Sequence, residues 1–154
     1  QGNGWSHKYA RRQWSLVDNE RYFFSNLNKF DEAMVHLLKE NLASLKDKCG
    51  VHLPWVEKLC DNEGDQVVAY QRGKLVFVFN WNGVKSFDGY GIPVKAGKYK
   101  VVLNTDATEF AGFGLSDDSA EHFTMPDDGY LKEGKGWLQL YLPARSAVVL
   151  EKID

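Results

Sequence analysis

This chain of 154 residues has few cysteines, no long apolar run and no large excess of charge of one sign. Cys49 and Cys60 are the two cysteines, too few and too irregularly spaced for a disulfide framework or a zinc site. No run of about 18 apolar residues occurs, so the sequence predicts no membrane-spanning helix. These absences predict a soluble protein of a reducing compartment, and we expect it in the cytoplasm.

Charge is nearly balanced along the chain, with a formal net charge of -2 at pH 7. Nine basic and nine acidic residues precede Gly64, and ten basic and twelve acidic residues follow it. Nucleic-acid binding rests mainly on neutralising phosphates, which takes a clustered basic face. Since neither part of the chain has such an excess, we expect neither a nucleic-acid partner nor a membrane.

The first part of the chain has the spacing of helices. Apolar side chains recur every three or four residues over residues 24–45, which predicts one long amphipathic helix. A shorter helix fits residues 9–17, and a single helical turn fits residues 54–57, where proline suits a first helical position. An uncovered apolar stripe would cost about 25 cal/mol per Å². The helices must therefore lie on the rest of this chain or on a larger protein.

After Gly64 the helical spacing ends and short runs of β-branched and aromatic residues follow, each bounded by Gly, Asn, Asp or Pro. These runs predict strands at residues 66–70, 74–80, 99–103, 137–142 and 147–150. Glycine-containing turns at residues 71–74 and 95–98 predict hairpins. Without intervening helices, such strands indicate a mainly β fold, an antiparallel β-sandwich.

The change of spacing divides the chain into two predicted parts. Residues 1–64 are expected to be helices followed by a linker, and residues 65–154 an all-β sandwich domain. The chain begins Gln1-Gly-Asn-Gly4 without a methionine. We therefore expect a piece of a longer polypeptide.

Several blocks of sequence carry a family resemblance. In chain order they are GNGWSHKYARRQWSLVD at 2–18, FDEAM at 30–34, LVFVFN at 75–80, DATEFAGFG at 106–114 with EHFT at 121–124, and YLPARSAVVL at 141–150. Together they resemble 1,4-alpha-glucan (glycogen or starch) branching enzymes over nearly the whole chain. The sequence departs from the family pattern around residues 45–52 and at Trp81.

The resemblance implies both a fold and an activity. Residues 1–64 would come from the end of a catalytic (β/α)8 barrel, and the β domain would be of the alpha-amylase C-terminal type. Branching is a retaining glycosyl transfer, from α-1,4 to α-1,6 linkages, by carboxylates at the ends of barrel strands. This chain lacks those strands, so we expect no catalytic residue, no cofactor and no activity of the piece alone. The implied partners are its own barrel and, in the intact enzyme, an α-glucan such as glycogen or amylose.

Three residues near the start of the chain are candidates through the resemblance. Arg11 and Arg12 would pair with carboxylates and carbonyls of the barrel, for which the planar guanidinium group is suited. The alternative is a pair of solvated arginines on a helix face; the neutral surroundings argue against a phosphate site. Trp5 would come near the active-site mouth and contact substrate only in the intact enzyme.

Two aromatic residues of the β domain are candidates for carbohydrate binding. Trp137, Gln139 and Tyr141 alternate with three leucines along one predicted strand, so the leucines enter the core and the other three face outward. Trp137 and Tyr141 either form a glucan platform, since aromatic faces stack on the apolar faces of glucose, or a surface that packs on the barrel. We prefer packing. Trp81 shares a side of its strand with two phenylalanines and is expected in the core.

One cluster of acidic residues and histidine lies late in the chain. Asp117, Asp118, Glu121 and His122 match no EF-hand or zinc spacing, so we expect a solvated acidic loop and no metal site. Besides the C-terminal portion of a branching enzyme, two alternatives remain. One is a free-standing carbohydrate-binding module, which the unaccompanied helices argue against, and the other is a structural or partner-binding domain.

Overall fold

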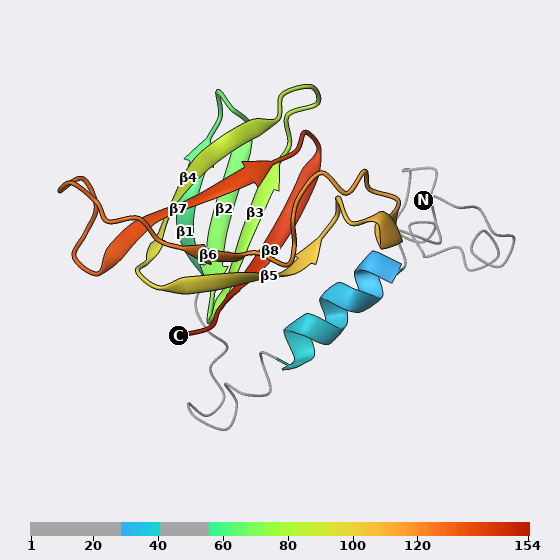
Figure 1. Ribbon diagram of the computed structural model, residues 1–154, viewed down its shortest axis with the longest axis horizontal. Helices are drawn as coiled ribbons and strands as arrows, with labels where there is room; N and C mark the ends of the chain where they lie inside the picture. Colours follow the sequence, from blue (N-terminus) through green and yellow to red (C-terminus); the bar gives the residue numbers. More distant parts are fainter. Residues whose placement is uncertain (1–28, 41–55) are drawn as a thin grey trace, which may run out of the picture.

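The computed structural model describes residues 29–40 and 56–154. Within these ranges the chain forms a helix at residues 29–40, here called the 29–40 helix, a short 3-10 helix η1 (Thr108–Phe110) and eight strands (Figure 1). The strands are β1 (Val56–Asn62), β2 (Val67–Arg72), β3 (Leu75–Asn80), β4 (Phe87–Lys95), β5 (Lys98–Asn104), β6 (Glu121–Phe123), β7 (Lys135–Leu142) and β8 (Ser146–Lys152). The predicted helix at residues 9–17 and the remainder of the one predicted at residues 24–45 lie outside the described residues.

The described strands form two antiparallel sheets. The larger sheet has the order β1-β2-β3-β8-β5-β6, and the smaller one pairs β4 with β7. Figure 1 shows β4 and β7 crossing one face of the larger sheet. The mainly β, antiparallel fold predicted from the sequence is confirmed.

The space between the sheets is filled by alternate side chains of both. The fully or nearly fully buried residues of this inter-sheet core are Val67, Ala69, Val76, Val78, Phe87, Ile92, Val94, Tyr99, Leu138, Leu140, Leu142 and Leu150. They come from strands of both sheets, as expected of a sandwich whose inner faces interdigitate. The three leucines of β7 point inward, as their alternation predicted.

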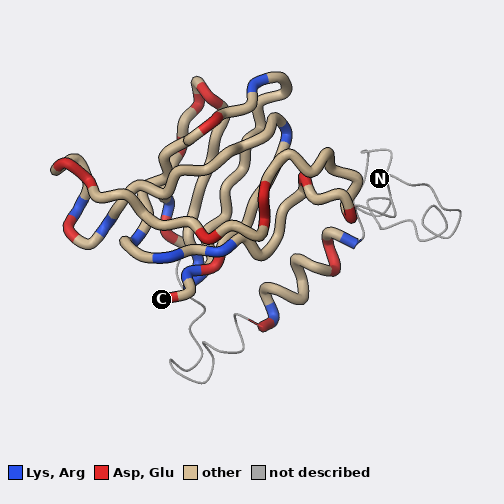
Figure 2. The backbone as a smooth tube through the Cα atoms, viewed as in Figure 1, with Lys and Arg blue, Asp and Glu red and all other residues tan. Residues whose placement is uncertain are grey.

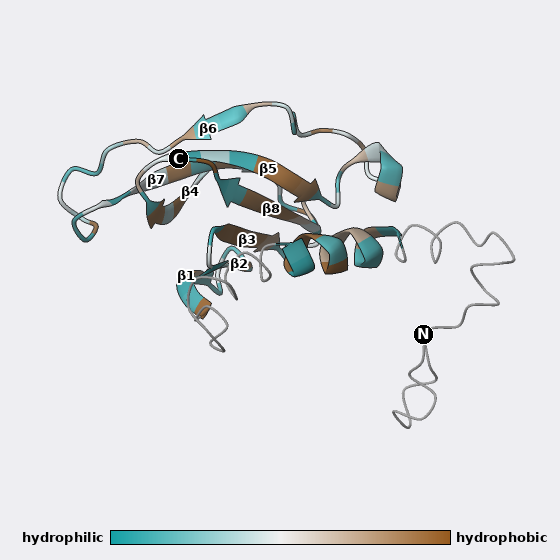
Figure 3. Ribbon diagram, turned by 90° about the horizontal axis from the view of Figure 1, so that it is seen from below, coloured by the Kyte–Doolittle hydropathy of each residue, from teal (hydrophilic) through white to brown (hydrophobic). Residues whose placement is uncertain are grey.

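The 29–40 helix lies on the opposite face of the larger sheet. Its partly buried residues Phe30, Ala33, Met34, Leu37 and Leu38 pack with the buried residues Leu75, Phe77, Leu103 and Val149. Phe30 also meets Phe110 of η1 edge to face, with ring centroids 5.2 Å apart. Figure 3 shows the helix along one side of the larger sheet, with hydrophobic and hydrophilic residues alternating along it. The described part of the apolar stripe is therefore covered by the β domain of this chain.

Three strands that the sequence did not predict, β1, β4 and β6, complete the sheets. Val56 and Glu57, expected in a helical turn, lie in β1 and pair with Arg72 and Gln71 of β2. A single helical turn leaves most of its backbone groups unpaired, whereas the ladder with β2 satisfies them, so the strand prevails. β1 falls inside residues 1–64, which the sequence assigned to helices and linker.

The turn at residues 95–98 also differs from its prediction. It joins β4 to β5, which belong to different sheets, so it is a corner between sheets and not a hairpin. Gly97 has a φ of 150° there, which few side chains tolerate. The turn at residues 71–74 does close the predicted hairpin between β2 and β3, with Gly73 at a φ of 62°.

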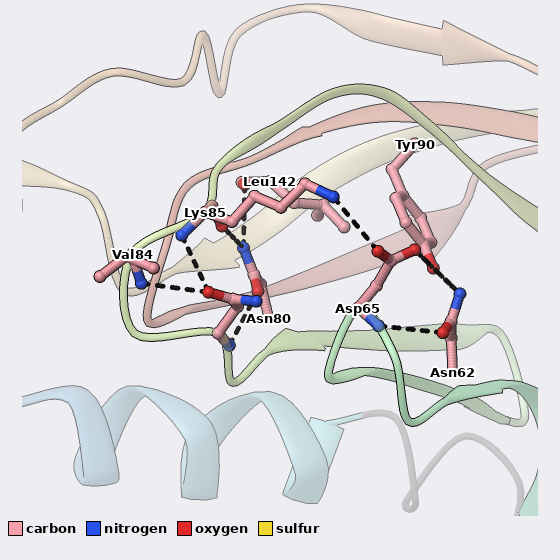
Figure 4. Close-up of polar contacts among 8 residues, drawn as sticks. Asn62, Asp65, Asn80, Val84, Lys85, Tyr90 and Leu142 are labelled. Carbon is pink, nitrogen blue, oxygen red and sulfur yellow. Dashed lines mark hydrogen bonds and ion pairs between the residues drawn. The ribbon is translucent and has the colours of Figure 1, made fainter.

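A polar network closes one end of the sandwich (Figure 4). The Asn80 side chain is 1% exposed, and its Nδ2 donates to the carbonyls of Lys85, Leu142 and Pro143 at 2.9–3.1 Å. Nearby, Asn62 Nδ2 donates to Tyr90 Oη at 3.0 Å and links the turn after β1 to β4. Burial raises the pKa of Tyr90 to about 12, so its hydroxyl stays protonated. These contacts tie the smaller sheet to the larger one.

Candidate functional site

The outer face of β7 carries the residues that the sequence proposed for carbohydrate contact. Gln139 and Tyr141 are exposed, Tyr141 by 39%, while Trp137 is half-buried. Trp137 and Tyr141 are four residues apart on one face, which separates them by about 13 Å at the usual rise of a strand. The structure therefore gives them different neighbours.

Trp137 is held on two sides. Its Nε1 donates to Asp127 Oδ1 at 2.9 Å, and the Asp127 carboxylate also accepts from the backbone N–H groups of Gly129 and Leu131. On the other side its ring lies over Gly91 of β4, where an added Cβ would come within 3.2 Å of Cε3. Within the described residues, Trp137 thus packs between β4 and the 124–134 loop.

Tyr141 lies beside a pocket of about 220 Å³. Its apolar lining comes from Leu115 and Ala120 of the loop and from Val101, Leu140 and Val148. The last three belong to the inter-sheet core or pack against it. The polar lining of the pocket includes Tyr141, Ser116, Asp117, Asp118 and His122. The structure therefore brings Tyr141 together with part of the segment expected to be only a solvated acidic loop.

The loop that forms one wall of this pocket is fixed by a buried carboxylate. Asp106 is 5% exposed, and its side chain accepts hydrogen bonds from the backbone N–H groups of Phe113, Leu115 and Ser116 at 2.5–3.3 Å. The chain passes so close to itself that a Cβ on Gly112 would lie 2.0 Å from the Asp106 carbonyl oxygen. The DATEFAGFG block therefore builds the loop.

Three more hydrogen bonds hold the acidic residues in place. Asn104 Nδ2 donates to Asp118 Oδ1 at 2.7 Å, which ties the loop to the end of β5. Asp117 Oδ1 accepts from the backbone N–H and the hydroxyl of Ser119, and these bonds lower the pKa of the Asp117 carboxyl. Asp117 is therefore ionised at neutral pH and oriented by its own turn.

His122 joins the loop to β7. Burial of the ring lowers the pKa of His122, and the Asp117 carboxylate and a hydrogen bond to the Gln139 backbone oppose that shift in part. The imidazole is thus mainly neutral at pH 7. No group of three or more His, Cys, Asp or Glu residues in residues 29–40 and 56–154 is arranged to hold a metal ion.

The prediction that Trp81 lies in the core is wrong, because this residue is 67% exposed. It follows the end of β3 and stacks on Phe79, with ring centroids 5.6 Å apart and an interplanar angle of 5°. Tyr70 continues the row by stacking on Phe77 and Phe79. The sequence identified the shared side correctly, but this side is the outer face of the larger sheet and not the inter-sheet core.

Three candidates, Trp5, Arg11 and Arg12, lie outside the described residues and stay predictions. Figure 2 shows basic and acidic positions interspersed over strand ends and loops of the described chain, without a basic stripe. None of the helices that the structure describes is long and apolar enough to cross a membrane.

Comparison with known proteins places the chain in a family. Residues 55–153 match the model of the alpha amylase, C-terminal all-beta domain. The chain is 38% identical to a 1,4-alpha-glucan-branching enzyme of Saccharomyces cerevisiae over 96% of its length and 38% identical to one of Candida glabrata over 98%. It is 39% identical over 82% of its length to a chloroplastic/amyloplastic 1,4-alpha-glucan-branching enzyme of Oryza sativa. It covers 20%, 20% and 15% of these three relatives. The chain belongs to the family of alpha amylase C-terminal all-beta domains.

Proposed function

We propose that this chain is the non-catalytic C-terminal part of a 1,4-alpha-glucan branching enzyme. The observation that carries the proposal is similarity over 96–98% of the chain to two proteins of that name, of which the chain spans only a fifth. The whole protein would transfer α-1,4-linked glucan to α-1,6 positions in glycogen biosynthesis. Its substrate would be an α-glucan and its location the cytoplasm, although one relative is chloroplastic/amyloplastic.

The contacts of the 29–40 helix support a mechanical role for the β domain. Five of its residues pack on the outer face of the larger sheet, around Leu75 and Phe77. If this helix comes from the end of the barrel, as the resemblance implies, the sheet would hold the last barrel segment in place. A barrel works only when its strand-end loops are held in fixed geometry, so this support contributes to activity without contacting the reacting atoms.

The five candidate residues take separate roles in this proposal. Arg11 and Arg12 pair with barrel groups, and Trp5 contacts substrate in the intact enzyme. Trp137 serves packing, because its ring is engaged by Gly91 and Asp127. Tyr141 is exposed beside a pocket and is the glucan-contacting candidate on β7.

A chimera tests the proposed function. The matching segment of the Saccharomyces cerevisiae relative would be replaced by this chain, and branching would be followed as the fall in iodine absorbance of amylose. We expect the chimera to keep branching activity, because the helix and the sheet that holds it are transplanted together.

The matched control is the same chimera with Leu138→Asp, which places a charge in the inter-sheet core where Leu138 is fully buried. This variant should lose activity through loss of the domain. A chimera that is soluble and folded by circular dichroism but does not branch amylose would contradict the proposal.

A further inference from the structure

The pocket beside Tyr141 has the size of a site for one small ring. Its volume of about 220 Å³ lies below the roughly 300–1,000 Å³ usual for sites that enclose a drug-sized ligand. A longer molecule could therefore place only one unit inside and would leave the rest in solvent.

The lining of the pocket combines an apolar wall with an exposed aromatic ring. Val101, Leu140 and Val148 provide the wall, and Tyr141, a residue that is 39% exposed, also lines the pocket. A pyranose ring has apolar faces of C–H groups that pack on such surfaces. Ligand sites are commonly apolar with a few fixed polar groups, which is the arrangement present.

The polar groups of the lining favour a neutral ligand that donates hydrogen bonds. Asp117 and Asp118 are each anchored through Oδ1, and a carboxylate has about four acceptor sites in all, so both can accept further O–H groups. The same two carboxylates repel phosphates and other anions. His122 and the Tyr141 hydroxyl add groups that can donate or accept. A polyhydroxylated neutral ring satisfies this set.

The wall of the pocket is formed before any ligand arrives. Asp106 fixes the loop at residues 113–116, and Asn104 fixes Asp118. The pocket also uses Val101 and Val148 of the larger sheet, whose neighbours Val102 and Val149 face the 29–40 helix. It therefore opens away from the helix and stays accessible when that face is covered.

We infer that this pocket is a subsite for one glucosyl unit of an α-glucan, with Tyr141 as its stacking residue. The choice of an α-glucan among neutral sugars rests on the proposed function.

Titration of the isotope-labelled chain with maltotriose, observed by the backbone amide NMR signals, tests the inference. We expect saturable shifts centred on residues 116–118, 122 and 141, with a dissociation constant in the millimolar range. Tyr141→Ala should weaken binding about tenfold, the scale of one lost stacking ring. Tyr130→Ala removes another exposed aromatic, on the 124–134 loop, and should leave the affinity unchanged.

Ala120→Phe provides a second variant that leaves Tyr141 in place and fills the pocket that Ala120 lines. It should abolish the shifts while the remaining spectrum stays that of the folded chain. The inference is overturned by maltotriose shifts that are absent from the pocket residues, or that survive both Tyr141→Ala and Ala120→Phe.

The chimera experiment separates this inference from the proposed function. An active chimera together with a pocket that does not respond to maltotriose overturns the subsite alone. An inactive chimera together with a pocket that binds maltotriose overturns the assignment to a branching enzyme and leaves the sugar site standing.

Discussion

His122 is a half-buried titratable residue whose protonation should affect stability. Its pKa in the folded chain is lowered by burial, below the ordinary value of about 6.5. Between the two pKa values the unfolded chain binds more protons than the folded chain, so stability rises with pH in that window. The stabilisation is fully present above the ordinary pKa and is lost as the pH falls through the folded pKa.

Urea unfolding at about pH 7 and about pH 5 measures this effect. We expect the free energy of unfolding to fall on acidification, and to fall less in His122→Gln than in the unchanged chain. His36→Gln is the matched control, because the His36 side chain lies exposed on the 29–40 helix. An identical acid response of His122→Gln and the unchanged chain would contradict the prediction.

The 29–40 helix depends on the sheet for its stability. In proteins most helical stability comes from the packing of an apolar face and not from helix propensity. Met34 packs with the residues around Phe77, whereas Val35 is 42% exposed. Comparing the same substitution at these two neighbouring positions therefore distinguishes a loss of packing from a change in helix propensity.

We predict that Met34→Asp frees the helix from the sheet while the inter-sheet core stays folded. Fully burying a methionine contributes about 1.5–3 kcal/mol; the partly buried Met34 contributes part of this, which is lost along with the added cost of a charge. Val35→Asp should change stability by no more than about 0.5 kcal/mol. Hydrogen exchange checks this: amides of residues 29–40 should exchange faster in Met34→Asp alone, and equal exchange in both variants would count against the contact.

At the scale of the whole molecule, the described residues form two antiparallel sheets with a helix packed on one of them. These two sheets are antiparallel, whereas the carboxylates of barrel glycosyl transfer sit at the ends of parallel strands. The acidic residues around the pocket, Asp117 and Asp118, are held by contacts within their loop and by Asn104.

We expect the isolated chain to be inactive on amylose. Neither the iodine absorbance nor the number of reducing ends should change beyond a heat-killed sample, with the Saccharomyces cerevisiae relative as the active control. Turnover above the heat-killed level would show that a catalytic centre lies within this chain.

Local patterns of β-branched, aromatic and alternating residues were sufficient to predict the regular strands. The runs predicted at residues 66–70, 74–80, 99–103, 137–142 and 147–150 correspond to β2, β3, β5, β7 and β8. The inward and outward sides of β7 follow from the two-residue period of a strand, a property of the chain itself.

The strands that the sequence missed lack that pattern. β4 contains Gly89, Gly91 and Pro93, residues that weaken a strand prediction, yet Gly91 leaves room for Trp137 and Pro93 is paired with it in the ladder. β1 has little alternation and is held by its ladder with β2 and by the 2.7 Å ion pair of Glu57 with Lys135. The ladder partner of β4, β7, is distant in sequence, and so is Lys135, which pairs with Glu57 of β1. β6 has only three residues, too few to show a pattern, and pairs with β5.

The sequence by itself therefore determined the type of fold, the core side of β7 and the family resemblance, because periodicity and motifs lie within short stretches. Only the tertiary structure decided which neighbours, or solvent, each outward-facing side chain contacts. It placed Trp81 in solvent, engaged Trp137 with Asp127, and joined Tyr141 to His122 across β6 and β7. The physical reason is that burial and pocket formation depend on contacts between segments far apart along the chain, and a local pattern carries no information about them.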